Sequence, residues 1–281
     1  MLRGLWRALP FTGPARPLVS VIELSGVIGA VGAGRKGLTL SRLEKAIEAA
    51  FKPQRLNAVA LAINSPGGSP VQARLIFSAI RRCARKRQRP VLAFIEDVGA
   101  SGGYILALAA DEIYADESSV IGSIGVISAT FGLQDMIAKA GVERRIYTAG
   151  ENKSQLDPFR PEDPEDVARL KEILDDIHAQ FISLVRERRG DKVADSKNDE
   201  IYSGAFWTAE AARERGLIDG TAHLGDFLRT RYGEDVKIRK FSPEGPSLLK
   251  RLLSGEALSD LGPEALIEGA EARAMWARYG I

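Results

Sequence analysis

Ser101 stands in a glycine-rich segment, GASGG (99–103), where a hydroxyl could act as a nucleophile. An apolar run at 91–95 comes before it and another at 105–109 follows, so we expect a strand, a turn and a helix that begins at the serine. The first turn of a helix has unpaired N–H groups and a dipole that stabilise negative charge. A serine in this place is most often only an N-cap, and the segment alone favours that structural interpretation.

Two other loops carry groups that would assist such a nucleophile. The sequence Ser-Pro-Gly-Gly (65–68) follows an apolar run at 58–63, and the N–H of Gly68 could stabilise an oxyanion. The sequence IGSIGV (121–126) supplies a second hydroxyl, that of Ser123. Each of these loops, taken alone, is more typical of a plain tight turn.

A nucleophilic serine also needs a base, and histidine is the first kind to consider. The pattern Gly-x-Ser-x-Gly around Ser101 fits a nucleophile elbow, which requires an acid and a histidine further along the chain. The chain has two histidines. His178 falls inside an expected long helix at 163–189, whereas His223 follows Asp219 in a loop and is the better candidate for a catalytic triad.

Lysine is the second kind of base. Lys153 lies in a polar loop at 149–162, which would have to fold back over the sheet edge to reach Ser101. A lysine in water has a pKa of about 10.4 and cannot serve as a base at neutral pH, but burial without a carboxylate partner lowers that pKa. Ser123 could hold the neutral amine by a hydrogen bond. A solvated surface lysine is the commoner case, and Lys153 alone does not decide between the two.

The elements that must position these residues alternate along the chain. We expect strands at 19–24, 58–63, 91–95, 112–115, 124–128 and 143–148, and helices at about 40–51, 71–87, 101–110, 132–140, 163–189 and 208–215. Continuous apolar strands that alternate with helices predict an α/β fold with a mainly parallel sheet flanked by helices. The carboxyl ends of parallel strands meet at one edge, so Ser101 and Gly68 are expected to lie close together there.

The composition excludes several classes of protein. Apolar residues make up 45% of the 281 residues and charged residues 27%, which is ordinary for a folded globular chain and excludes extensive disorder. The formal net charge of +2 provides no strong field for nucleic acid. The single cysteine, Cys83, excludes a disulfide framework, and with two histidines no metal site is expected.

No stretch reads as a signal peptide or a transmembrane helix, so a cytoplasmic location is expected. Residues 1–18 read as a tail. Within it, Leu2, Leu5, Trp6 and Leu9 fall at helical spacing with two arginines between them, which permits weak peripheral contact with a membrane.

Four motifs in this order are together specific, although each is short. They are NSPGG (64–68), EDVGASGGY (96–104), GSIGV (122–126) and GENKS (150–154). With them, the chain resembles the signal peptide peptidase A (SppA/SohB-like) family of serine proteases from about Val19 to Tyr232. The resemblance implies a ClpP/crotonase-like fold of repeated β-β-α units. It also implies a peptidase domain at 19–235, after the tail at 1–18 and before a C-terminal helical tail at 236–281.

The resemblance implies a role for each candidate residue. It places the nucleophile at Ser101 and the general base at Lys153, and Gly68 and Ser123 match the oxyanion donor and the hydroxyl that orients the lysine. Gly102, the next residue after the nucleophile, is a plausible second oxyanion donor by analogy with the wider fold. A Ser/Lys dyad agrees with the shortage of histidine.

The implied activity is that of a serine endopeptidase that forms an acyl-enzyme on hydrophobic peptides, such as signal-peptide remnants or membrane-derived peptides. The substrate is expected to add as a strand near 69–71 and 124–128. A homo-oligomer is implied, and no cofactor. Two alternatives stay open: a Ser/His/Asp hydrolase that uses His223, and a crotonase-fold protein that is not a peptidase.

Overall fold

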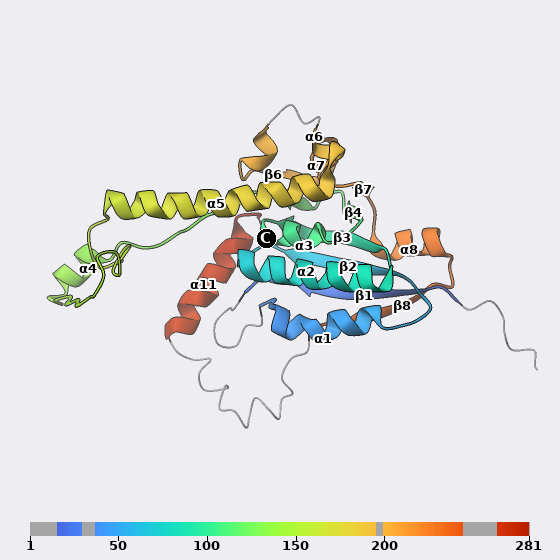
Figure 1. The fold of residues 1–281 in the computed structure, drawn as a ribbon, viewed down its shortest axis with the longest axis horizontal. Coiled ribbons are helices and arrows are strands. Elements are labelled where there is room, and N and C mark those ends of the chain that lie inside the picture. Colours follow the sequence, from blue (N-terminus) through green and yellow to red (C-terminus); the bar gives the residue numbers. More distant parts are fainter. Residues whose placement is uncertain (1–15, 30–36, 195–198, 244–262, 281) are drawn as a thin grey trace, which may run out of the picture.

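One eight-stranded β-sheet runs through the body of the molecule (Figure 1). The computed structural model describes residues 16–29, 37–194, 199–243 and 263–280. The strands are β1 (Leu18–Ser25), β2 (Leu56–Ser65), β3 (Val91–Ala100), β4 (Glu112–Ala115), β5 (Val120–Gly122), β6 (Phe206–Thr208), β7 (Gly220–Thr221) and β8 (Lys237–Phe241). Their order is β6-β5-β3-β2-β1-β8, with β4 beside β3 and β7 beside β4, and every pair is parallel except β5 with β6.

Helices cover both faces of this sheet. They are α1 (Leu40–Phe51), α2 (Pro70–Arg87), α3 (Gly102–Ala107), α4 (Gln134–Lys139), α5 (Pro164–Arg189), α6 (Asp191–Ala194), α7 (Ala209–Glu214), α8 (Leu224–Tyr232) and α11 (Pro263–Ala277), with a 3₁₀ turn at Asp199–Tyr202. Strand β2 explains the layering, because its successive side chains point to opposite faces. Val59, Leu61 and Ile63 join the core beneath α1, α2 and α3, while Ala58 and Ala60 join a smaller core beneath α8. The predicted α/β class, a mainly parallel sheet flanked by helices, is confirmed.

The register brings three loops to one edge of the sheet. Ser65, the last residue of β2, lies opposite Gly99 of β3, and Ala100, the last residue of β3, lies opposite Gly122, the last residue of β5. The loops that follow β2, β3 and β5 therefore leave the sheet side by side, as their positions after parallel strands predict.

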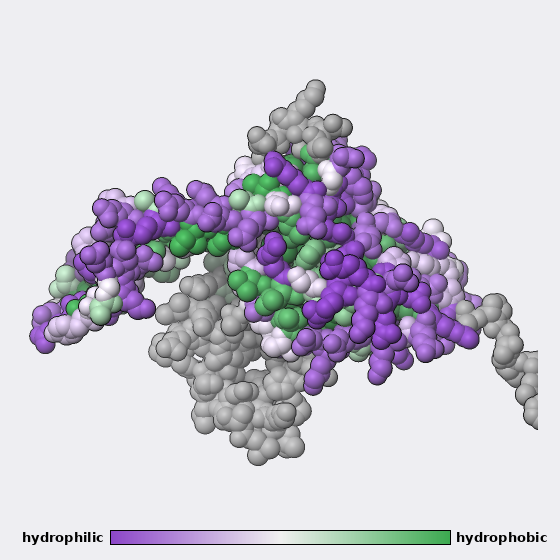
Figure 2. Space-filling model, viewed as in Figure 1, coloured by the Kyte–Doolittle hydropathy of each residue, from purple (hydrophilic) through white to green (hydrophobic). Residues whose placement is uncertain are grey.

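A long projection, residues 127–173, extends away from the body and is called the arm here (Figure 1). It consists of α4, the loops on either side of it and the first part of the 26-residue helix α5. Several large apolar side chains of the arm are exposed, among them Ile127, Phe131, Met136 and Tyr147. Figure 2 shows hydrophobic side chains on the side of the arm that faces the body.

Two predicted strands are not formed. Residues 143–148 have no regular structure in the arm, and the residues after Gly122 leave the sheet, so that β5 at 120–122 stands in place of the strand expected at 124–128. An apolar run becomes a strand only where another strand can pair with it. Strand β8 pairs with β1 and lies within the segment expected to be a helical tail. Leu2 to Leu9 lie outside the described residues.

The C-terminal end of α5 is fixed to the body by a buried ion pair. Arg189, whose side chain is 2% exposed, contacts Asp219 through Nη1 at 3.0 Å and Nη2 at 3.1 Å, and donates from Nε to the Gly216 carbonyl. Lys192 adds a second cation at 2.5 Å from the same carboxylate. Burial acts to raise the pKa of Asp219, but the hydrogen bonds from Arg189 and Lys192 outweigh it and keep that pKa below its ordinary value.

We expect Asp219→Ala to lower the free energy of unfolding by about 3 kcal/mol at pH 7, because it leaves the buried guanidinium without its partner. Since the pKa of Asp219 is lowered in the folded state, the carboxylate stabilises the fold above the ordinary carboxyl pKa and loses this effect as the pH falls. Urea unfolding should therefore show a difference between wild type and variant that shrinks only below about pH 4. Glu210→Ala, which breaks the exposed pair with Arg213, is the control and should leave stability unchanged. An equal loss in the two variants would contradict the prediction.

Candidate active site

Ser101 has a backbone conformation that is rare for a residue with a side chain. Its φ is 52° and its ψ is −121°, in the turn between β3 and α3. The turn is held by a hydrogen bond from the Ser101 N–H to the Gly122 carbonyl at 2.8 Å. The Ser101 hydroxyl forms no N-cap hydrogen bond with the helix that it precedes. The N-cap interpretation therefore fails, and strain of about 1–3 kcal/mol is held at a serine whose hydroxyl is free to react.

The Ser-Pro-Gly-Gly loop packs directly against this serine. A Cβ on Gly67 would lie 2.8 Å from the Ser101 Cβ, and a Cβ on Gly68 would lie 2.1 Å from the Ile28 carbonyl oxygen. Both glycines have positive φ, 105° and 136°. Within the described part of the chain, the N–H groups of Gly68 and Gly102 donate no hydrogen bond, and they come from the two segments that meet at Ser101. Two such donors beside a nucleophile are what an oxyanion hole requires.

Ser123 joins the same site from the third loop. Its φ is 52°, and its N–H donates to the Ala205 carbonyl at 2.7 Å. Gly122 before it has a φ of 113° and packs against the ring of Trp207. The small residues of this loop therefore let the chain turn sharply from the sheet edge into the cleft.

Ser101, Gly102, Gly68 and Ser123 all line one cleft of about 470 Å³. Its other walls are largely apolar and include Val71, Ile105, Val126, Ile127, Ile177 and Phe181. Val71 and Ile127 remain 65% and 64% exposed, so apolar surface lies open to solvent beside the cavity.

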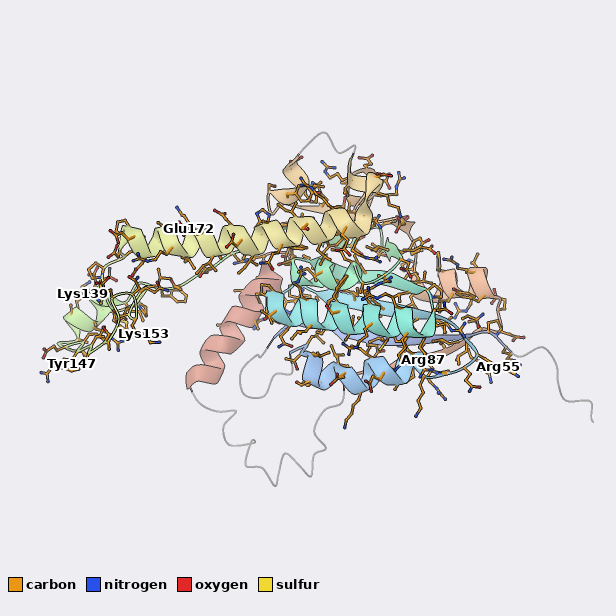
Figure 3. All side chains as sticks on the ribbon, in the orientation of Figure 1. Arg55, Arg87, Lys139, Tyr147, Lys153 and Glu172 are labelled. Carbon is orange, nitrogen blue, oxygen red and sulfur yellow. The ribbon has the colours of Figure 1, made fainter. Side chains whose placement is uncertain are left out.

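Lys153 lies far from this cleft. Figure 3 shows it near the end of the arm, close to Lys139 and Tyr147. It is exposed and does not line the cleft with Ser101. The expectation that loop 149–162 folds back over the sheet edge of its own chain is therefore wrong.

Contacts inside the arm explain why this loop stays away. Asp157 pairs with Arg144 at 3.2 Å, and the Leu133 N–H donates to the Pro158 carbonyl at 2.6 Å. At the start of α5, Asp166 accepts from the Leu156 N–H at 3.0 Å. These bonds join the loop to α4 and α5, which carry it away from the body.

Neither histidine lies in the cleft. His223 is 71% exposed and approaches Asp116 at 3.5 Å in a separate cavity that also contains Glu96 and Asp97. The ring of His178 instead contacts the backbone, with its Nε2 3.0 Å from the Ile124 carbonyl oxygen. The structure therefore does not supply the histidine that a Ser/His/Asp triad would need at Ser101.

The cleft also contains residues that the sequence did not indicate. Met275, in the last turn of α11, and Arg278 and Tyr279, in the turn that follows this helix, line it together with Ser101. No local pattern in the sequence tells which surface the end of this helix and the turn after it contact.

Other features of the molecule bear on cofactors and membranes. Among the described residues, no three His, Cys, Asp or Glu side chains gather in a way that could hold a metal ion. None of the described helices combines the length and apolar character needed to cross a bilayer.

The sequence of this chain matches the model of one protein family. The model of peptidase family S49 matches residues 83–237, which include the Ser101 turn, the Ser123 loop and Lys153. The chain belongs to peptidase family S49. This membership confirms the predicted resemblance to the SppA/SohB-like family, and the strand order agrees with the predicted α/β class with a mainly parallel sheet.

Known relatives differ widely in length. The protease-type protein slr0021 of Synechocystis is 31% identical over 250 residues, which are 88% of this chain and 86% of that protein. The chloroplast serine protease SPPA of Arabidopsis thaliana is 27% identical over 275 residues, 93% of this chain and 39% of the relative. A Brucella abortus protein named Na(+)/H(+) antiporter NhaA is 47% identical over 275 residues, 94% of this chain. This chain spans 37% of the length of that Brucella protein.

A solved structure of the 1510-N membrane-bound stomatin-specific protease, as a mutant with a substrate peptide, is 17% identical with a TM-score of 0.47. That match covers 88% of this chain and all of the other.

The close approach at Gly68 leads to a direct prediction. If the Gly68 N–H stabilises an oxyanion, we expect Gly68→Ala to lower kcat by about 10²-fold or more, because the new Cβ would meet the Ile28 carbonyl and displace that N–H. Gly26→Ala is the matched control, since Gly26 also has positive φ (115°) but a Cβ there would meet nothing within 4 Å. The control should lose some thermal stability and keep kcat. A Gly68→Ala enzyme with unchanged kcat would remove Gly68 from the oxyanion hole.

Proposed function

We propose that this chain is a serine endopeptidase that cleaves hydrophobic peptides, with Ser101 as the nucleophile. The observation that carries the proposal is the strained Ser101 turn in an apolar cleft. The hydroxyl of this serine does not cap the helix, and beside it lie two glycine N–H groups that have no hydrogen-bond acceptor among the described residues. A hydroxyl, an oxyanion hole and an apolar binding surface are the parts that acyl transfer from an apolar peptide needs.

The cleft suits an extended apolar peptide. Residues 69–71 and 124–128 border it, and the backbone of the second segment belongs to no strand. A substrate backbone that pairs there would place its side chains against Val71, Val126 and Ile127. Signal-peptide remnants and other membrane-derived peptides have this apolar character.

A second copy of the chain supplies the base. Proton transfer needs the amine within about 3 Å of the hydroxyl, or one water away. Lys153 of the same chain is instead exposed on the arm and does not line the cleft with Ser101 (Figure 3). The arm that carries Lys153 also exposes Phe131, Met136 and Tyr147, which a monomer would leave in water. A homo-oligomer in which the arm of one copy covers the cleft of the next would bury these side chains and bring the amine to Ser101. Ser123, at the cleft wall, is then placed to accept or donate a hydrogen bond that orients it.

The mechanism follows from this arrangement. The neutral amine of Lys153 takes the proton of Ser101 as the hydroxyl oxygen attacks the peptide carbonyl. The N–H groups of Gly68 and Gly102 stabilise the tetrahedral oxyanion. The protonated amine then gives its proton to the leaving nitrogen, and the acyl-enzyme forms as the C–N bond breaks. Water, deprotonated by Lys153, hydrolyses the ester and restores Ser101. We propose a cytoplasmic location for this activity, with weak peripheral membrane contact through the N-terminal tail, residues 1–18.

An active-site-serine probe tests the proposal. A fluorophosphonate should label the wild-type protein at Ser101 and stop its hydrolysis of a fluorogenic apolar peptide, and Ser101→Ala should show neither reaction. Ser41→Ala, which removes an exposed hydroxyl that does not line the cleft, is the control and should still be labelled. A crotonase-type enzyme needs no nucleophilic serine, so an unlabelled, inactive wild-type protein would reject the peptidase assignment.

A further inference from the structure

The end of helix α11 lies at the mouth of the Ser101 cleft. Figure 1 shows this helix, in red, beside the beginning of α2 and below the arm. It comes from the far end of the sequence, outside the segment that matches the family model. Met275, Arg278 and Tyr279 nevertheless line the same cleft as the nucleophile.

Two contacts hold the helix end in this place. The ring of Tyr279 meets the ring of Phe206 edge to face, with 5.2 Å between ring centroids and 73° between ring planes. Its hydroxyl lies 3.5 Å from the Pro66 carbonyl oxygen, a long contact with the loop that carries Gly68. Tyr279 therefore joins β6 on one side of the cleft to the oxyanion loop on the other.

We propose that Met275 and Tyr279 form the wall of the cleft that selects a large apolar side chain of the substrate. This inference rests on the proposed peptidase function and names the residues that set its preference. Met275 and Tyr279 present a flexible thioether and an aromatic ring, both of which pack well against large apolar groups. Val71 and Ile127, exposed in the same cleft, provide other surfaces that the peptide would cover.

The geometry favours a wall over a plug. The cleft keeps a volume of about 470 Å³ with the helix end in place, and Ser101 is still partly exposed. A helix end that occupied the substrate position would fill this space. The helix instead borders the cavity and narrows it on the side where Tyr279 meets Phe206.

The experiment uses pairs of fluorogenic peptides that differ at one position, which is leucine in one peptide and alanine in the other. A series of such pairs moves this position along the peptide. The variants are Met275→Ala and Tyr279→Ala, with Arg273→Ala as the control. Arg273 is exposed and lies two residues from Met275, on the opposite side of the same helix. Steady-state assays give kcat and KM for each pair.

At the position that meets the wall, Met275→Ala and Tyr279→Ala should raise KM for the leucine peptide about tenfold and change kcat less than twofold. KM for the alanine peptide should change little, so the preference for leucine is lost. Tyr279→Phe keeps the ring contact with Phe206 and should behave like the wild type, as should Arg273→Ala.

Two results would overturn the proposal that Met275 and Tyr279 form a substrate-selecting wall. If Tyr279→Ala accelerates cleavage of both peptides equally, the helix end competes with substrate and is a plug. If both variants keep the leucine preference at every position, the helix end does not contact substrate.

Binding to a Ser101→Ala background separates this inference from the proposed function. Fluorescence anisotropy of a labelled leucine peptide should show about tenfold weaker binding when Tyr279→Ala is added. If the leucine peptide binds in this way but the wild-type protein never hydrolyses it, the peptidase function is rejected and the role of Met275 and Tyr279 in binding is supported. Equal binding by the two proteins would reject the wall alone.

Discussion

Lys153→Ala is expected to lower kcat for an apolar peptide by about 10³-fold, whereas His223→Ala should stay within twofold of wild type. Without the amine, the Ser101 hydroxyl has no group to take its proton as it attacks. His223 lies in a separate cavity, is largely exposed and faces Asp116, so its loss removes nothing from the Ser101 cleft. Steady-state hydrolysis with Ser101→Ala as the blank measures both effects.

The comparison needs a control for the arm itself. Lys139→Ala removes another exposed lysine of the arm and should keep full activity (Figure 3). Lys153→Arg keeps a positive charge but supplies a guanidinium that stays protonated, so it should be as inactive as Lys153→Ala. Activity that survives Lys153→Ala and disappears with His223→Ala would replace the dyad by a Ser/His/Asp hydrolase.

Mixing two inactive chains should restore activity. One chain carries Ser101→Ala and keeps Lys153, and the other carries Lys153→Ala and keeps Ser101. If each site takes its serine from one copy and its lysine from another, random exchange in an equal mixture leaves about one quarter of the sites complete. The mixture should therefore regain roughly 25% of wild-type kcat per chain, while each variant alone stays inactive.

This result depends on exchange of subunits, which has its own measurement. The two chains are labelled with a donor and an acceptor dye, and energy transfer between them reports mixed assemblies. Energy transfer without recovered hydrolysis would mean that the arm of each chain closes on its own cleft. In that case the second copy is not needed for the base.

Much of the site could be predicted from sequence, because it depends on the rules of parallel sheets. Ser101, Gly68 and Ser123 lie in loops that follow apolar segments of the chain. The carboxyl ends of parallel strands share one edge of a sheet, so these loops are expected to lie together. The pairing of Ser65 with Gly99 and of Ala100 with Gly122 fulfils that expectation. The positive φ of Ser101 was not predictable, because the sequence does not distinguish a serine in a strained turn from a serine that caps a helix.

Other parts depend on contacts that no local pattern records. The direction of the arm follows from long-range bonds such as Arg189 with Asp219 and from the Arg144–Asp157 pair, which join segments 13 or more residues apart. The segment 143–148 has strand-like composition but no strand beside it, so its propensity alone does not fold it into a sheet. The apolar spacing of α11 predicts a helix, whereas its place beside Ser101 depends on the rings of Phe206 and Tyr279.

The separation of Lys153 from Ser101 has a consequence for a newly made molecule. If the base comes from a second copy, as proposed above, a chain that has just left the ribosome carries one half of each of two different centres and cannot yet hydrolyse peptides. Hydrolysis then begins only after molecules meet, so the rate at low abundance should climb more steeply than the amount of protein. Such a design would spare the cell a separate inhibitor during synthesis.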